Sequence, residues 1–210
     1  MKIAVMGASQ GVGLELVKLS LAAGHEVTAL VRDAAKQGMK EPKLTIVIGD
    51  IRDPSAVGSV VSGKDAVCIC VGIPPTRKPV DVFSEGTRQV LAAMKSTPGI
   101  KLIAITGIGA GDSKGHGGFF YDRIINPLLL GTIYADKNRQ ESMIKASGAT
   151  WMIVRPGFLT NGPRTGNYSV IDDLTNITAG KISRADVADF MLKELRNPSH
   201  FGKTPLLCYA

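Results

Sequence analysis

Residues 2–13 read KIAVMGASQGVG, an apolar run that passes directly into a glycine-rich loop. The apolar run predicts a buried strand. Residues 11–23 predict a helix, because apolar side chains recur there every three or four positions, and Gly24 supplies the usual end of such a helix. A strand, a glycine loop and a helix in this order predict the first unit of an alternating α/β fold.

The same alternation continues along the chain. Further strands are predicted at residues 26–31, 44–48, 66–71, 101–106 and 151–154, with helices that begin at Asp53-Pro54 and extend over 82–95 and 185–195. Strands that are apolar on both faces and separated by helices indicate a parallel sheet covered on both sides. The fold class is therefore α/β, a doubly wound parallel sheet of the Rossmann type, with residues 1–210 in a single domain.

The second half of the chain is less regular. Residues 107–118 are rich in glycine and predict a loop, and residues 119–147 predict a long helical stretch that breaks near Pro127 or Gly131. The strand at 151–154 should stop at Arg155-Pro156-Gly157, and a last strand is predicted at 205–209. We expect a small substrate-side region formed by about residues 107–132 and 157–182.

The chain carries 25 Lys and Arg against 18 Asp and Glu, a formal net charge of +7. These cations are dispersed rather than clustered, which disfavours a nucleic-acid surface, and a small anionic ligand accounts for the excess equally well. No run of about 18 apolar residues predicts a membrane span, and the first residues show no secretory signal. We therefore expect a cytoplasmic protein with neither a membrane nor a nucleic-acid partner; monomer and homodimer both stay open.

The chain contains three cysteines, Cys68, Cys70 and Cys208. An odd number without a secretory signal is typical of a reducing compartment. Cys68 and Cys70 lie two apart in an apolar run, so we interpret them as small core side chains on one face of a strand. No further ligands stand near them at metal-binding spacing, so no metal site is expected.

The loop of residues 7–13 predicts a dinucleotide site. Gly7 permits a sharp turn, Gly11 lets the backbone approach a diphosphate, and Gly13 allows the helix to pack closely on the strand. The start of the helix offers free N–H groups and a positive dipole to phosphates. The expected cofactor-binding residues of this loop are Gly7, Ser9, Gln10, Gly11, Val12 and Gly13.

The end of the second strand bears on the choice of coenzyme. An acidic residue there would bind both ribose hydroxyls of NAD, whereas arginine can pair with the 2′-phosphate of NADPH. The sequence has Arg32 followed by Asp33, and neighbours on a strand point to opposite sides. We favour Arg32 and therefore NADPH, with NAD as the weaker candidate.

Four more positions follow predicted strands at the edge where open α/β sheets bind ligands. Asp50 can accept from the adenine amino group, or it can cap the helix that begins at Pro54. Ile51 can cover the adenine ring, and Val71 and Gly72 border the cofactor farther along.

These motifs resemble the atypical short-chain dehydrogenase/reductases. The resemblance rests on the glycine loop, on LVRD at 30–33, on GDIRD at 49–53, on Asp136-Lys137 with Glu141, and on IVRPG at 153–157. Within that group the chain is similar to the small NAD(P)H-binding oxidoreductases that include biliverdin-IXβ/flavin reductases and nitrogen-metabolite-repression regulators. The resemblance covers nearly the whole chain and implies that Lys137 holds the nicotinamide ribose and that Pro156 borders the nicotinamide.

The chain departs from the Tyr-x-x-x-Lys motif of active members. Lys137 stands in the lysine position, but Ile133 replaces the tyrosine that would donate a proton. Tyr134 is a candidate substitute, although its direction differs by about 100° in a helix. Thr106 takes the place of the usual serine and could donate a hydrogen bond. The candidate catalytic residues are therefore Thr106, Tyr134 and Lys137.

The missing tyrosine favours acceptors whose reduction needs no proton from a side chain of the protein. Conjugated acceptors such as flavins, quinones and tetrapyrroles stabilise the anion that hydride transfer creates, so that solvent can protonate it. Aromatic side chains of the glycine-rich segment can stack on such a planar molecule, or they can pack the start of the long helix. The candidate acceptor residues are His116, Phe119, Phe120 and Phe158. We expect an NADPH-dependent reductase, with a non-catalytic NADP(H) sensor as the alternative.

Overall fold

The computed structural model describes residues 1–33 and 38–209. An eight-stranded sheet runs through the molecule in the order β3-β2-β1-β4-β5-β6-β10-β8, and all neighbours are parallel except β10 and β8. The strands are β1 (Lys2–Met6), β2 (Glu26–Val31), β3 (Leu44–Ile48), β4 (Ala66–Ile69), β5 (Lys101–Ile105), β6 (Thr150–Pro156), β10 (Leu206–Cys208) and β8 (Ser169–Ile171). The predicted doubly wound sheet of the Rossmann type is confirmed.

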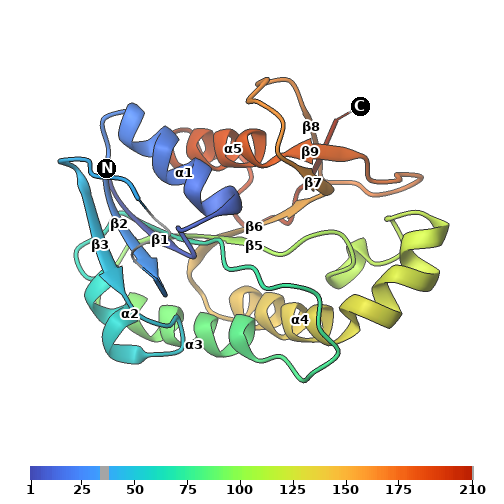
Figure 1. Ribbon diagram of the computed structural model, residues 1–210, viewed down its shortest axis with the longest axis horizontal. Coiled ribbons are helices and arrows are strands. Elements are labelled where there is room, and N and C mark those ends of the chain that lie inside the picture. Colours follow the sequence, from blue (N-terminus) through green and yellow to red (C-terminus); the bar gives the residue numbers. More distant parts are fainter. Residues whose placement is uncertain (34–37, 210) are drawn as a thin grey trace.

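Helices cover both faces of this sheet. In Figure 1, α1 (Gly11–Ala22) and α5 (Arg184–Arg196) lie above it, and α2 (Pro54–Val61), α3 (Val82–Met94) and α4 (Gly131–Lys145) lie below it. Alternate side chains of β1 enter the two cores, with Ile3 and Val5 on the side of α1 and α5 and with Ala4 and Met6 on the other. The strand order changes direction between β1 and β4, which opens a crevice at their carboxyl ends.

Local signals set several boundaries. The side chain of Asp53 accepts from the Ser55 N–H at 2.9 Å at the start of α2. Asp53 is therefore the cap of α2, and the alternative capping role for Asp50 is wrong. Ser183 accepts from the Asp186 N–H at 3.0 Å at the start of α5.

The strand predicted at 151–154 continues as β6 to Pro156. Proline is tolerated there because β5 already ends opposite Val154, so no neighbour on that side requires an N–H donor. On the other side, β10 still pairs with Pro156. The expected stop at Arg155-Pro156-Gly157 is therefore wrong by two residues.

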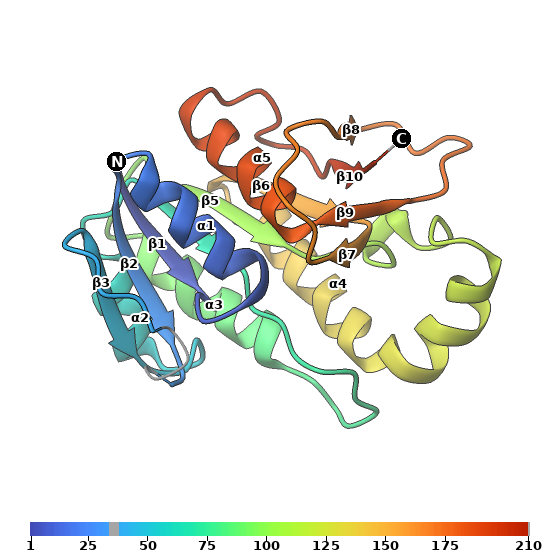
Figure 2. The same ribbon diagram turned by 45° about the horizontal axis from the view of Figure 1, so that its top comes forward.

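Three short strands were not predicted: β7, β8 and β9. β7 (Phe158–Thr160) and β9 (Lys181–Ser183) pair in parallel as a separate two-stranded sheet. β7 and β8 lie within the segment 157–182 of the expected substrate-side region, and β9 extends one residue beyond it. Each has only three residues, too few to show a period of two in the sequence. Figure 2 shows β7 and β9 beside the start of α5.

The long helical stretch changes type rather than simply breaking. A π-helix, η3 (Tyr121–Leu130), contains Pro127 and passes into α4 at Gly131. It forms the yellow-green segment that projects at the right of Figure 2. The preceding glycine-rich loop contains one short 3₁₀ turn, η2 (Gly111–Ser113).

Cys68, Cys70 and Cys208 are free thiols, and Cys68 and Cys70 both pack in the core beside α1 and α5. Burial raises the pKa of Cys68 to about 12. Across residues 1–33 and 38–209, no helix has both the length and the apolar character that crossing a membrane needs. Within the same ranges, no group of three His, Cys, Asp or Glu side chains is arranged to hold a metal ion.

Gly157 links the main sheet to the small sheet and leaves no room for a side chain. A Cβ there would overlap the carbonyl oxygen of Gly180, whereas a Cβ at Gly162 would stand 3.6 Å from its nearest neighbours. We predict that Gly157→Ala lowers the free energy of unfolding by about 1–3 kcal/mol, and that the control Gly162→Ala stays within about 1 kcal/mol of the wild type. Urea denaturation measures both, and equal stability of the two variants would contradict the prediction.

Candidate functional site

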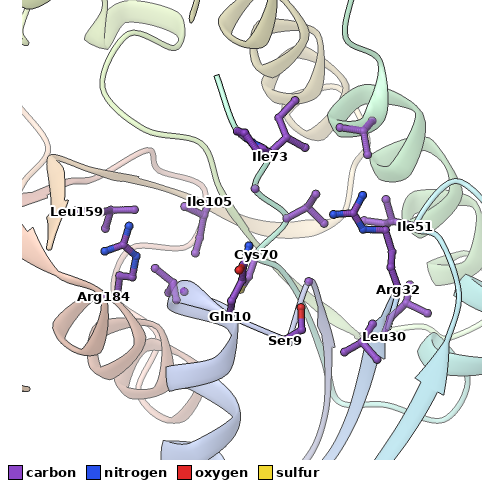
Figure 3. A pocket seen from close by; sticks show the side chains of 18 of the residues that line it. Ser9, Gln10, Leu30, Arg32, Ile51, Cys70, Ile73, Ile105, Leu159 and Arg184 are labelled. Carbon is purple, nitrogen blue, oxygen red and sulfur yellow. The ribbon is translucent and has the colours of Figure 1, made fainter. Parts of the chain in front are cut away.

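A cavity of about 660 Å³ opens at the carboxyl ends of β1, β4 and β5 (Figure 3). It is lined by the glycine loop, by the residues that follow β2, β3 and β4, and by side chains from α4, β7 and α5. The lining residues are Gly7, Ser9, Gln10, Gly11, Val12, Leu30, Val31, Arg32, Gly49, Asp50, Ile51, Cys70, Val71, Gly72, Ile73, Pro74, Val82, Ile105, Thr106, Lys137, Leu159, Asn161 and Arg184.

The glycine loop has the geometry that the sequence predicts. Gly7 has φ +82°, and a Cβ there would come within 2.9 Å of the Cys70 carbonyl oxygen. A Cβ on Gly13 would overlap the Gly7 carbonyl oxygen, so α1 packs directly on the loop. No side chain caps α1, and its first turn holds no acidic residue. The N–H groups at this helix start are therefore available to an anion in the cavity.

Arg32 and Asp50 lie at one end of the cavity. Of the described residues, Arg32 lines it and Asp33 does not. Both Asp50 oxygens accept from the Arg52 guanidinium at 3.0 Å. The hydrogen bonds from Arg52 hold the pKa of Asp50 below its usual value. Figure 3 shows Arg32 close to Ile51 at this end.

Lys137 lies toward the other end of the cavity, where α4 meets β5. Its ammonium group donates to the Thr106 carbonyl and lies 5.1 Å from the centre of the Phe83 ring. Burial lowers the pKa of Lys137 from its usual value of 10.5 to about 8, although nearby Glu141 acts in the opposite direction. The lysine is therefore fixed in orientation and keeps its charge at neutral pH.

The Thr106 hydroxyl is used inside the protein. It donates to Glu141 Oε1 at 2.8 Å, and Glu141 also binds Arg155 through Nε at 3.0 Å and Nη2 at 2.6 Å. Arg155 is fully buried, and its Nη1 is 2.5 Å from Asp112 Oδ1. Thr106 does donate a hydrogen bond, but Glu141 accepts it inside the protein. A role for Thr106 toward an acceptor in the cavity stays a prediction.

Tyr134 does not line the cavity, although it was the candidate substitute for the missing tyrosine. Its hydroxyl accepts from Tyr121 at 2.9 Å, beside the backbone of Gly107 and Gly109. Burial raises the pKa of Tyr134 above its usual value. One position later than the family tyrosine, the side chain lies outside the cavity lining, and the role of Tyr134 as proton donor stays a prediction.

The predicted acceptor residues also lie outside the cavity lining. Phe119 and Phe120 are 78% and 64% exposed, so they neither roof the cavity nor pack the helix start. The His116 ring nitrogen is 2.9 Å from the Ile177 carbonyl oxygen, and Phe158 packs edge-to-face on Tyr121. Pro156 is buried and does not line the cavity either; its carbonyl accepts from the Ile108 N–H at 3.3 Å.

The sequence patterns did not indicate Arg184 and Asn161 as residues of the site. Arg184 is the first residue of α5, and its Nη1 donates to Asn161 Oδ1 at 2.7 Å. The sequence does mark the helix start through Ser183. It carries no signal for the direction of the next side chain, because the short strands β7 and β9 that orient it were not recognisable.

The fold and the site together define a Rossmann-type protein that binds a nicotinamide dinucleotide. Residues 7–198 match the family described as NAD(P)H-binding. The chain belongs to this NAD(P)H-binding family.

The similar proteins include named reductases. An uncharacterised chloroplastic protein of Arabidopsis thaliana is 32% identical over 209 residues, which cover 92% of this chain and 71% of the relative. The NAD(P)H azoreductase of Xenophilus azovorans is 28% identical over 206 residues, which cover 94% of this chain and 64% of the relative. The solved anaerobilin reductase of Escherichia coli O157:H7 superposes with a TM-score of 0.81 at 24% identity, covering 99% of this chain and 97% of that one.

We predict that Lys137→Met changes how stability depends on pH. The folded protein releases the Lys137 proton near pH 8 and the unfolded chain only near 10.5, so the charged lysine opposes folding below pH 8 and this cost fades as the pH rises. The stability of the wild type relative to Lys137→Met should therefore increase by about 2–3 kcal/mol between pH 7 and pH 10. Urea denaturation at several pH values measures this, with the exposed Lys18→Met as control. A constant difference would show that Lys137 is not buried as described.

Proposed function

We propose that this protein is an NADPH-dependent reductase that transfers hydride to a planar conjugated acceptor of the flavin, quinone or tetrapyrrole type. The observation that carries the proposal is a cavity of about 660 Å³ whose described lining residues include the glycine loop and Lys137 but no tyrosine. We further propose that it is a member of the atypical short-chain dehydrogenase/reductases and acts in the cytoplasm.

The residues of the cavity fit the cofactor. The uncapped start of α1 and the close-packed glycine loop suit a diphosphate. We assign the 2′-phosphate to Arg32, the adenine to Asp50 and Ile51, and the nicotinamide ribose to Lys137. Val71 and Gly72 would border the cofactor between these ends. The arrangement orders the molecule along the cavity, with the adenosine at Arg32 and the nicotinamide toward Thr106.

The proposed chemistry needs little from the protein beyond orientation. Bound NADPH supplies a hydride. An acceptor that gains this hydride becomes an anion and must take one proton, and water can supply it when conjugation spreads the charge. Thr106 and Tyr134 are both held in internal hydrogen bonds. Reduction of an isolated ketone would need an acidic side chain positioned to donate a proton to the oxygen. The side chains of this site therefore favour a conjugated acceptor.

The named relatives support the same class of acceptor. An azo compound carries a conjugated N=N bond, and the azoreductase relative spans nearly this whole chain. Because this chain covers 64% of that relative, the shared substrate class remains part of our proposal.

The alternative is a non-catalytic NADP(H) sensor. It is favoured by one observation: His116, Phe119, Phe120 and Phe158, which we expected to hold the acceptor, all lie outside the cavity lining. A sensor would bind NADPH tightly and need no acceptor site.

We predict that the purified protein oxidises NADPH when an azo dye, FMN, a quinone or a linear tetrapyrrole is supplied. Loss of absorbance at the nicotinamide band measures the reaction, with heat-denatured protein as control. At least one acceptor should be reduced at a rate that scales with protein concentration. Tight NADPH binding without turnover of any acceptor would instead support the sensor.

We predict that Arg32→Ala raises the dissociation constant of NADPH about 10- to 100-fold and leaves that of NADH within about twofold of the wild type. The reason is that only NADPH has a 2′-phosphate for a charge-assisted hydrogen bond. Isothermal titration calorimetry gives both dissociation constants. Arg88→Ala, which removes an exposed arginine paired with Glu85 on α3, is the matched control. Equal losses for both coenzymes would remove Arg32 from the 2′-phosphate site.

A further inference from the structure

Arg184 brings a positive charge to the start of α1. Its Nε and Cδ lie 3.8 and 3.9 Å from the position that a Cβ of Gly11 would occupy. In Figure 3, Arg184 stands beside Leu159, at the side of the cavity opposite Arg32. The two arginines therefore mark different parts of one elongated site.

Among the described residues, no acidic side chain neutralises the charge of Arg184. Its hydrogen-bond partner is the neutral amide of Asn161 at 2.7 Å, and within residues 1–33 and 38–209 no carboxylate forms an ion pair with it. Arg155 differs, since Glu141 and Asp112 both bind it. An arginine that points into a cavity without a carboxylate partner is suited to bind an anionic ligand there.

The surrounding structure fixes the backbone position of Arg184. Asp186, two residues later in the first turn of α5, accepts from the hydroxyl groups of Thr165 at 2.8 Å and Tyr209 at 2.6 Å. It also accepts from the Thr165 and Gly166 N–H groups, both at 2.8 Å. These contacts hold the first turn of α5 to the chain around it. Asn161 follows β7, which pairs with β9 directly before Arg184.

We propose that Arg184, oriented by Asn161, binds the cofactor diphosphate from the side opposite the start of α1, at the phosphate next to the nicotinamide ribose. The helix N–H groups and the guanidinium then enclose the same anion. An acidic group on the acceptor is the competing ligand. The contact with Gly11 favours the diphosphate, because Gly11 is where the backbone itself can approach phosphate.

This assignment rests on the placement of the dinucleotide under our proposed function, and it is independent of the acceptor. The proposal gives a role to the small sheet of β7 and β9, which the sequence patterns did not predict. It positions Asn161 and Arg184 over the glycine loop from a distant part of the chain.

Three ligands test the proposal by binding alone: NADPH, NADH and adenosine 2′,5′-bisphosphate, which lacks the nicotinamide-side phosphate. We predict that Arg184→Gln raises the dissociation constants of NADPH and NADH by the same factor, about 10- to 100-fold. The dissociation constant of the bisphosphate should stay within about twofold of the wild type. Arg32→Ala should give the complementary pattern, with losses for NADPH and the bisphosphate but not for NADH. Isothermal titration calorimetry measures all three.

Two further variants separate binding from folding. Arg184→Lys retains the charge and should recover part of the NADPH affinity, and Asn161→Ala should weaken NADPH and NADH together by a smaller factor than Arg184→Gln. Thermal unfolding of the ligand-free variants identifies any loss of structure. Unchanged NADPH binding by Arg184→Gln, or an equal loss of the bisphosphate, would overturn the proposal.

Failure of the proposed function gives different results. A protein that binds NADPH but reduces no acceptor would lose the reductase assignment, and the pattern of Arg184→Gln would be unaffected. A protein that prefers NADH would lose the assignment of Arg32 to the 2′-phosphate, yet the equal losses expected for Arg184→Gln would still be measurable.

Discussion

The ion pair between Glu141 and Arg155 joins the helix that carries Lys137 to the centre of the sheet. Arg155 is fully buried on β6, and Glu141 binds it through two hydrogen bonds while also accepting from Thr106 at the end of β5. Removing one partner of such a pair leaves an uncompensated buried charge, which costs about 3–5 kcal/mol. A Cβ at Gly111 would overlap the Arg155 guanidinium, so the same pair also requires glycine in the loop above it. Lys137 lies one helical turn before Glu141, and its place at the cavity follows from this contact.

The cavity combines two kinds of positive charge. The backbone at the start of α1 offers the partial charges of its N–H groups, whereas Arg32, Lys137 and Arg184 offer full charges at separate points along the cavity. The acidic side chains nearby are already bound, since Asp50 pairs with Arg52 and Glu141 with Arg155. The arrangement suits a long anion with phosphates at more than one position, and it gives binding a direction along the cavity.

Sequence patterns predicted most of the sheet and the glycine loop, because these depend on local periodicity and on glycine geometry. The start of α5 was predictable for the same reason, since Ser183 caps its own helix. Contacts between distant segments were not predictable. Thr106 is occupied by Glu141, and Tyr134 turns toward Tyr121, through packing that no spacing in the sequence reveals. Arg184 was missed because the three-residue strands that aim it carry no recognisable period.

The free thiols of Cys68 on β4 and of Cys70 directly after it provide an internal measure of how this fold opens. Alkylating reagents attack the thiolate, and burial raises the pKa of Cys68 to about 12 and that of Cys70 well above its usual value. At neutral pH the native state therefore protects the fully buried Cys68 from modification until the first strands separate from α1, whereas Cys70 is only partly buried. Cys70 also lines the cavity, so its rate of alkylation reports on occupancy of the site, while the rate at Cys68 reports on unfolding of the core. One chemical label thus distinguishes ligand protection from global stability within the three-residue segment 68–70.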